Sequence, residues 1–183
     1  MRKTPIWRPS RFATSATPTR FIKVSDSEVL VVALPKIYTL SATNGWSEKY
    51  DLASSALALP NAVDVDFRAD KIFAVENNRI VALDVPKNDA GLDFGAAHQV
   101  FSPVGETKSA KFARYLPTGD MMALVYSDNA NTTLYILRAD QSKQVVNFAA
   151  PTLRVAAAGK WLALADANTI RIYEAGTTTA PVV

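Results

Sequence analysis

The stretch that decides the fold is Trp161–Tyr173, which reads WLALADANTIRIY. The runs Trp161–Ala165 and Thr169–Tyr173 are rich in apolar and β-branched residues, and a short polar segment separates them. Two such runs around a polar break are typical of a β-hairpin. The same arrangement occurs three more times in the chain, so the sequence predicts an all-β fold built from repeats.

The spacing of the repeats indicates a particular all-β architecture. The third strand of each repeat is expected to begin at Ile37, Ile80, Leu134 and Ile170, with gaps of 43, 54 and 36 residues. Four short strands in about 40 to 45 residues are typical of a propeller blade. We therefore expect four propeller-type blades, at about residues 21–52, 62–101, 108–148 and 153–183. They would form either a small closed propeller or a partial one, and no segment has a helical period.

The body resembles the β-propeller superfamily, WD40-like in the broad sense, over about residues 21–176. The resemblance lies in the period and the hairpin pattern. A typical WD40 blade ends its third strand in Trp-Asp, whereas the third strands here end in Thr39-Leu40, Leu83-Asp84, Leu137-Arg138 and Ile172-Tyr173. The resemblance therefore implies a fold and transfers no functional residue.

The last repeat is incomplete in sequence, because its fourth strand would have to lie in the weak segment 177–183. An open propeller would expose sheet surface and strand edges, which proteins normally cover. We expect a strand from the N-terminal arm or from another subunit to complete this repeat. Self-association that completes the propeller is one form of this prediction.

Charge separates residues 1–20, a basic arm that contains proline, from the body. Six of the 20 basic residues precede the first acidic residue, Asp26, and the other 14 are outnumbered by 17 acidic residues. Pro5, Pro9 and Pro18 prevent a continuous helix, so we expect an extended arm. Such a split in charge suggests that the arm and the body contact different partners.

Three interpretations of the arm remain open: a docking arm on protein, a nucleic-acid contact through phosphates, and a mitochondrial transit peptide. We favour docking, because apolar side chains stand between the charges, and Trp and Arg are enriched among interface anchors. Trp7 is the strongest single candidate. The predicted partner-binding residues of the arm are Arg2, Lys3, Ile6, Trp7, Arg8, Arg11 and Phe12.

Catalytic chemistry finds little support. The chain has no cysteine and one histidine, His98, so it lacks the ligands of a zinc site and a triad would depend on that single imidazole. With 7 glycines it has no Gly-rich phosphate loop. We predict no catalytic residues, no metal and no cofactor.

Two groups of residues with side-chain oxygens, and the tryptophans of the body, could each have either a binding role or a structural role. Asp64, Asp66 and Asp70 could hold a hard cation, but we expect Asp64 and Asp66 to be the solvent face of an amphipathic strand. Asp128, Asn129 and Asn131 are explained by turn chemistry. For Trp46 and Trp161 we expect core packing between blades rather than a stacking platform.

These observations predict a non-enzymatic structural or interaction subunit of a larger assembly, in which a propeller platform carries a basic docking arm. A virus or phage particle is the first setting that we consider. The alternative is a WD40-like adaptor in a cellular protein or ribonucleoprotein complex, with the arm on nucleic acid. The expected partners are other protein subunits, and no membrane segment is expected, because no apolar run approaches the length of a membrane helix.

Overall fold

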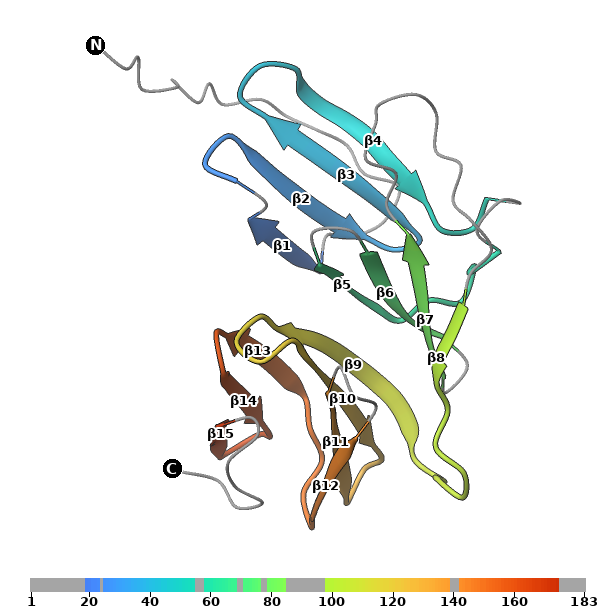
Figure 1. Ribbon diagram of the computed structural model, residues 1–183, viewed down its shortest axis with the longest axis vertical. Coiled ribbons are helices and arrows are strands. Elements are labelled where there is room, and N and C mark those ends of the chain that lie inside the picture. The colour runs from blue at the N-terminus through green and yellow to red at the C-terminus, as the bar shows by residue number, and fades with distance from the viewer. Residues whose placement is uncertain are drawn as a thin grey trace. The chain divides into compact units, whose positions relative to one another are not determined.

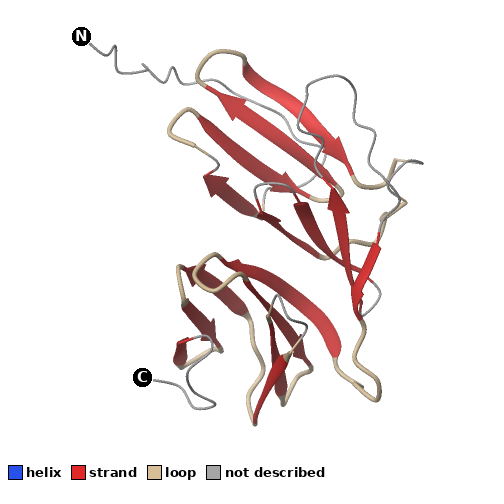
Figure 2. Ribbon diagram, in the orientation of Figure 1, coloured by secondary structure: helices blue, strands red, loops and turns tan. Residues whose placement is uncertain are grey.

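Short strands joined by turns make up the chain, because apolar and polar residues alternate with a period of two. The computed structural model describes residues 19–23, 25–54, 58–68, 71–76, 79–84, 98–138 and 142–174. Every regular element in these segments is a β-strand (Figure 2). The chain divides into two compact units, and the division lies between Ala62 and Val63.

The first unit contains sheet 1, an antiparallel meander in the order β1-β2-β3-β4 (Figure 1). Its strands are β1 (Arg20–Lys23), β2 (Glu28–Ala33), β3 (Lys36–Ser41) and β4 (Gly45–Asp51). The Asn44-Gly45 pair turns the chain from β3 to β4, and Gly45 has φ = 68°, a conformation that glycine adopts without strain. Trp46 packs against the buried cluster of Val31, Ala33 and Tyr38 on the same sheet.

The second unit contains three further antiparallel meanders. Sheet 2 comprises β5 (Asp64–Arg68), β6 (Lys71–Glu76), β7 (Arg79–Asp84) and β8 (His98–Phe101). Sheet 3 comprises β9 (Ser109–Leu116), β10 (Met121–Ser127), β11 (Thr132–Leu137) and β12 (Lys143–Phe148). Sheet 4 comprises β13 (Arg154–Ala158), β14 (Trp161–Ala165) and β15 (Ile170–Glu174). The segment 177–183, expected as a fourth strand of the last repeat, lies outside the described residues.

Strand β10 is the centre of the second unit, because all seven of its residues are buried. A continuous apolar run of this kind is typical of a strand covered on both faces. Met122, Leu124 and Tyr126 point toward sheet 2 and join a core cluster with Phe73 and Val75.

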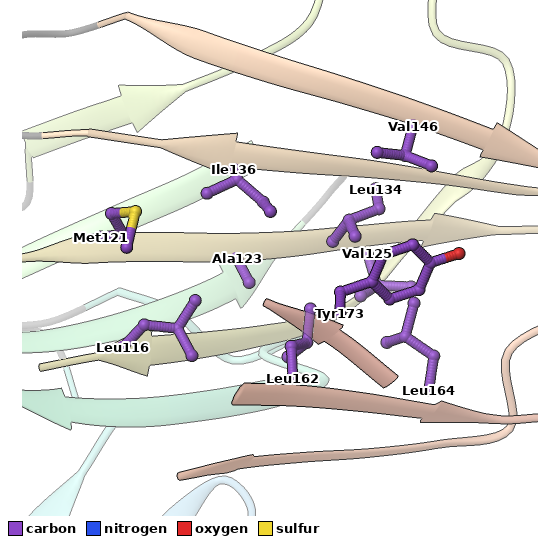
Figure 3. Packing of buried hydrophobic residues seen from close by; sticks show 10 residues of the cluster. All are labelled: Leu116, Met121, Ala123, Val125, Leu134, Ile136, Val146, Leu162, Leu164 and Tyr173. Atoms are coloured by element: carbon purple, nitrogen blue, oxygen red, sulfur yellow. The ribbon is translucent and has the colours of Figure 1, made fainter. Parts of the chain in front are cut away.

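The other face of β10 packs on sheet 4. Met121, Ala123 and Val125 join a second core cluster with Leu162 and Leu164 of β14 (Figure 3). Tyr173 of β15 completes this cluster and stacks on Phe148, with 6.3 Å between ring centroids. Sheets 2, 3 and 4 therefore pack face to face in chain order, as successive blades of a propeller do.

Candidate interaction site

The inner strands of sheets 2 and 3 are joined by two carboxylates. Asp66 is 5% exposed, and its Oδ2 accepts a hydrogen bond of 2.7 Å from the Tyr115 backbone N–H. Asp64 Oδ2 accepts a hydrogen bond of 3.0 Å from the Ala113 N–H and also pairs with Arg114. These N–H groups lie two residues apart on β9 and so point to the same edge of the strand, while β10 pairs with the other edge.

The expectation that Asp64 and Asp66 form a solvent face is therefore wrong. Polar and apolar residues do alternate along β5, but the polar face lies against the edge of β9 that does not pair with β10 rather than against water. Each carboxylate accepts an N–H that would otherwise be buried without a partner. Both carboxylates therefore have a structural role, which is to connect β5 of sheet 2 with β9 of sheet 3. Asp70, the third member of the predicted group, lies outside the described residues.

Polar side chains also gather where sheet 3 meets its loops. A surface pocket of about 460 Å³ opens there. It is lined by Thr107, Lys108, Asp128, Asn131, Thr132, Asn147, Phe148 and Ala149. Most of its lining residues are polar, so the pocket is a candidate binding site for a polar ligand in the second unit.

A chain of hydrogen bonds connects the pocket to the interior. Lys108 Nζ donates to Glu106 Oε1 at 3.2 Å and to Thr133 Oγ1 at 2.9 Å. The Thr133 hydroxyl donates to Asn147 Oδ1 at 2.9 Å, and the Tyr135 hydroxyl donates to Glu106 Oε2 at 3.0 Å. Glu106 and Lys108 are the only charged members of this hydrogen-bond network, and they neutralise each other as an ion pair. Both side chains are largely buried, with 6% of Glu106 and 19% of Lys108 exposed.

The hydrogen bonds fix the charge states of the network. Burial raises the pKa of Glu106, but the Lys108 N–H, the Tyr135 hydroxyl and the Lys108 ammonium outweigh burial and hold this pKa below its ordinary value. Burial and the neighbouring Glu106 carboxylate raise the pKa of Tyr135 to about 12. At neutral pH Glu106 is therefore a carboxylate and Tyr135 a neutral phenol, and neither has the pKa near the working pH that general acid or base catalysis needs.

At the mouth of the pocket, Asp128 closes its own loop. Its Oδ1 accepts hydrogen bonds of 2.7 Å from the N–H groups of Ala130 and Asn131, and these bonds lower the pKa of the Asp128 carboxyl. This is the Asx-turn chemistry that the sequence predicts for this segment. Across the residues that the structure describes, no group of three or more His, Cys, Asp or Glu side chains could hold a metal ion.

A different surface, on sheet 4, is not covered by any described residue of the second unit. We define the outer face of sheet 4 as the side opposite the cluster that packs on sheet 3. By strand register it comprises Arg154, Ala156, Ala158, Trp161, Ala163, Ala165, Ile170, Ile172 and Glu174. Trp161 is 40% exposed and Ile170 is 61% exposed, although both are large apolar residues. Lys160 Nζ lies 5.1 Å from the centroid of the Trp161 ring, and the same ammonium pairs with Glu174.

The outer face of sheet 4 repeats the positions with which sheets 2 and 3 bury their own neighbours. In each sheet, two cross-strand pairs of the second and third strands point toward the next sheet. They are Val75–Ile80 and Phe73–Ala82 in sheet 2, Val125–Leu134 and Ala123–Ile136 in sheet 3, and Ala165–Ile170 and Ala163–Ile172 in sheet 4. The eight residues of sheets 2 and 3 are buried, with at most 8% exposure. Sheet 4 thus carries the surface of a blade that receives another blade, and no described residue of the second unit covers it.

Trp161 departs from its expected role, since it is not packed in the core between blades but lies on this outer face. The sequence pattern that could have identified the face is the alternation of alanine with leucine on β14 in the last repeat. His98 begins β8, where its backbone pairs with Ala82.

The residues predicted for the arm all lie outside the described residues: Arg2, Lys3, Ile6, Trp7, Arg8, Arg11 and Phe12. Strand β1 begins at Arg20, and the Thr19 N–H donates to the Val32 carbonyl at 2.8 Å. In addition, no helix among the described residues is long and apolar enough to cross a bilayer.

Comparisons with known proteins place the fold. No protein-family model matches the chain, and no curated protein matches it significantly in sequence. Among solved structures, Hsv2 of Kluyveromyces lactis superposes with a TM-score of 0.59 at 16% identity, over 90% of this chain and 51% of that one. A second structure of that protein, with a complete loop 6CD, gives a TM-score of 0.60 at 16% identity, over 90% and 50%. The CNH domain of AfRom2 gives 0.54 at 9% identity, over 86% and 52%.

These likenesses concern the fold alone, because the identities are low. They confirm the expected fold class: the chain has an all-β fold of the β-propeller type, built of antiparallel four-stranded or three-stranded sheets. The chain spans about half the length of the solved structures that it matches.

Proposed function

We propose that this protein works by binding other proteins rather than by catalysis, as an interaction subunit of a larger assembly. The observation that carries the proposal is the outer face of sheet 4. It has the apolar pattern with which sheets 2 and 3 contact the next sheet, and Ile170 on it is 61% exposed. Burying such a face stabilises a complex by about 25 cal/mol per Å² of apolar area before the costs of association.

The alternative centre of activity, the pocket on sheet 3, supports catalysis poorly. Of its charged lining residues, Lys108 is paired with Glu106, and Asp128 is held by backbone N–H groups. A general acid or base needs a pKa near the working pH. The pKa of Glu106 is instead lowered, so the pocket is better suited to structure or to weak polar contacts.

We assign the arm to the same function. Its four cations before residue 12, together with Ile6, Trp7 and Phe12, have the composition of an interface anchor. A cellular protein complex is our preferred setting, because the solved structures of similar fold include a protein of Kluyveromyces lactis. A virus or phage particle remains a prediction from the sequence, and so does an arm that binds nucleic acid.

A photo-crosslinking side chain at Ile172 tests the proposal in extracts of the cells that make the protein. If the outer face of sheet 4 is an interface, irradiation gives a covalent adduct with a protein chain. The matched control carries the same side chain at Val104, which is fully exposed in a turn of the second unit, and gives no adduct. Equal adduct yields at the two positions, or none at either, would reject the outer face of sheet 4 as a binding surface.

A further inference from the structure

The turn between β3 and β4 carries chemistry that lies outside the interaction function proposed above. Asn44 is followed directly by Gly45, and both residues are exposed at the tip of the hairpin. We propose that Asn44 is a covalent modification site, where the side-chain amide is lost spontaneously and aspartate and isoaspartate are formed. The pair Asn-Gly occurs once in the sequence, so the reaction singles out this turn.

The reaction uses only the main chain and water. The Gly45 nitrogen attacks the side-chain Cγ of Asn44 and closes a five-membered succinimide ring, while the side-chain nitrogen leaves as ammonia and takes up the Gly45 N–H proton. Water then opens the ring at one of its two carbonyl groups. Breaking the Cγ–N bond gives aspartate. Breaking the bond between the nitrogen and the backbone carbonyl carbon gives isoaspartate, whose main chain runs through Cβ and Cγ.

The geometry of the turn favours ring closure. A side chain on the residue after asparagine obstructs the attack, and Gly45 has none. Its φ is 68°, and apart from its chain neighbours no described atom lies within 4 Å of the position that a Cβ would occupy. The Gly45–Ser41 pair is the last of the β3–β4 ladder, and the ends of a ladder open most easily. The Gly45 nitrogen can therefore reach the Asn44 side chain without unfolding of sheet 1.

The Asn44 side chain is also available for the reaction. Its backbone N–H donates to Ser41 Oγ at 2.9 Å, and this bond holds the turn. No hydrogen bond joins the side-chain amide of Asn44 to another of the residues that the structure describes. The amide is therefore not held away from the Gly45 nitrogen.

Asn168 provides a comparison within the same chain. It is exposed in the turn between β14 and β15, and its N–H donates to Asp166 Oδ1 at 2.8 Å. The next residue is Thr169, whose β-branched side chain obstructs ring closure. The Thr169 N–H also donates to Asp166 Oδ1, at 2.7 Å. Asn168 therefore keeps its amide, although it lies at a hairpin tip as Asn44 does.

Conversion of Asn44 changes the hairpin on which it lies. Each product adds one negative charge, so the net charge of the chain falls from +3 to +2. Isoaspartate also adds a methylene to the main chain of the turn, which disturbs the register of β4 on β3. Trp46 follows two residues later and packs on the buried cluster of β2 and β3. Isoaspartate therefore loosens the packing of Trp46, whereas aspartate leaves the length of the main chain unchanged.

Peptide mapping of the folded chain tests the proposal. The protein is kept in mildly alkaline buffer, which favours loss of the Gly45 amide proton, and samples are digested with trypsin at intervals. Trypsin releases residues 37–49 and 161–171, in which Asn44 and Asn168 are the only amide side chains. Conversion raises the mass of a peptide by about 1 Da. We expect residues 37–49 to convert at least about tenfold faster than residues 161–171.

A second readout identifies the isoaspartate product. Protein isoaspartyl methyltransferase with radioactive S-adenosylmethionine should label residues 37–49 from the aged protein and leave residues 161–171 unlabelled. The Gly45→Asp variant supplies the matched control, because aspartate tolerates a positive φ but places a side chain beside the ring. This variant should convert at Asn44 at least about tenfold more slowly than the unmodified chain.

The synthetic peptide of residues 37–49 gives the rate of conversion without the fold. We expect the folded chain to convert at a rate within about tenfold of this peptide, because a hairpin tip opens at little cost. A folded chain that converts more slowly than this would overturn the inference, since the turn would then protect Asn44. Conversion of Asn44 no faster than that of Asn168 would overturn it as well.

Discussion

Buried carboxylates in the second unit accept hydrogen bonds from backbone N–H groups, and Asp66, which is 5% exposed, is the clearest case. Replacing it with Asn puts an amide that can donate where Oδ1 and Oδ2 accept from Phe67 and Tyr115. We expect Asp66→Asn to lower the free energy of unfolding by about 1 to 3 kcal/mol, the usual cost of leaving a buried group unsatisfied. Urea denaturation measures this difference.

The control for that substitution is Asp26→Asn. Asp26 pairs with Lys23, but its side chain is 98% exposed. Loss of an exposed pair should change the free energy of unfolding by less than about 0.5 kcal/mol. If the two variants lose equal stability, the hydrogen bonds of Asp66 between β5 and β9 contribute no more to the free energy of unfolding than an exposed ion pair does.

Glu106 makes stability depend on pH. Burial alone would raise its pKa, but the Lys108 N–H, the Tyr135 hydroxyl and the Lys108 ammonium lower it below the value in the unfolded chain. The unfolded state therefore binds the proton first as the pH falls, so the contribution of Glu106 is complete above about pH 5 and is lost below it. We expect acid unfolding monitored by fluorescence to become less steep in Glu106→Gln. An unchanged acid profile would show that another carboxyl governs it.

Elements differ in how well they are covered, and this difference should be measurable. All seven residues of β10 are buried between two sheets, whereas β15 has exposed and partly exposed residues on the outer face of sheet 4. Local opening is easiest where few apolar contacts must break. In hydrogen exchange of dilute protein, amides of β10 and β11 should be the slowest of the second unit and those of β15 at least about tenfold faster, which is about 1.4 kcal/mol. Equal protection would mean that β15 is covered.

The strands and the turn at Gly45 could be predicted from the sequence, because alternation and turn residues are local signals. What the polar face of a strand contacts could not be predicted from the sequence. Asp64 and Asp66 alternate with apolar residues whether they meet water or the edge of β9, and only the packing of β5 beside β9 decides between them. The exposure of Trp161 could not be predicted for the same reason, since a sequence pattern shows that a face is apolar but not whether the chain itself covers it.

At the scale of the whole molecule, the arm and the body carry different charge. Removing residues 1–18 takes away Arg2, Lys3, Arg8 and Arg11 but no acidic residue, so the net charge falls from +3 to −1. Thr19, which bonds to Val32, and all of β1 are retained. We therefore expect the free energy of unfolding of the truncated chain to differ from that of the full chain by less than about 0.5 kcal/mol.

The same truncation should abolish retention of the protein on heparin, a polyanion that tests whether the arm presents its charge. Four cations predict that the logarithm of the affinity falls with the logarithm of salt concentration with a slope of up to about −3 to −4. The control replaces Ile6, Trp7 and Phe12 with Ser and keeps every charge, so it should still bind heparin while losing any contact that depends on apolar anchors. Retention that survives the truncation would place the basic contact surface on the body rather than on the arm.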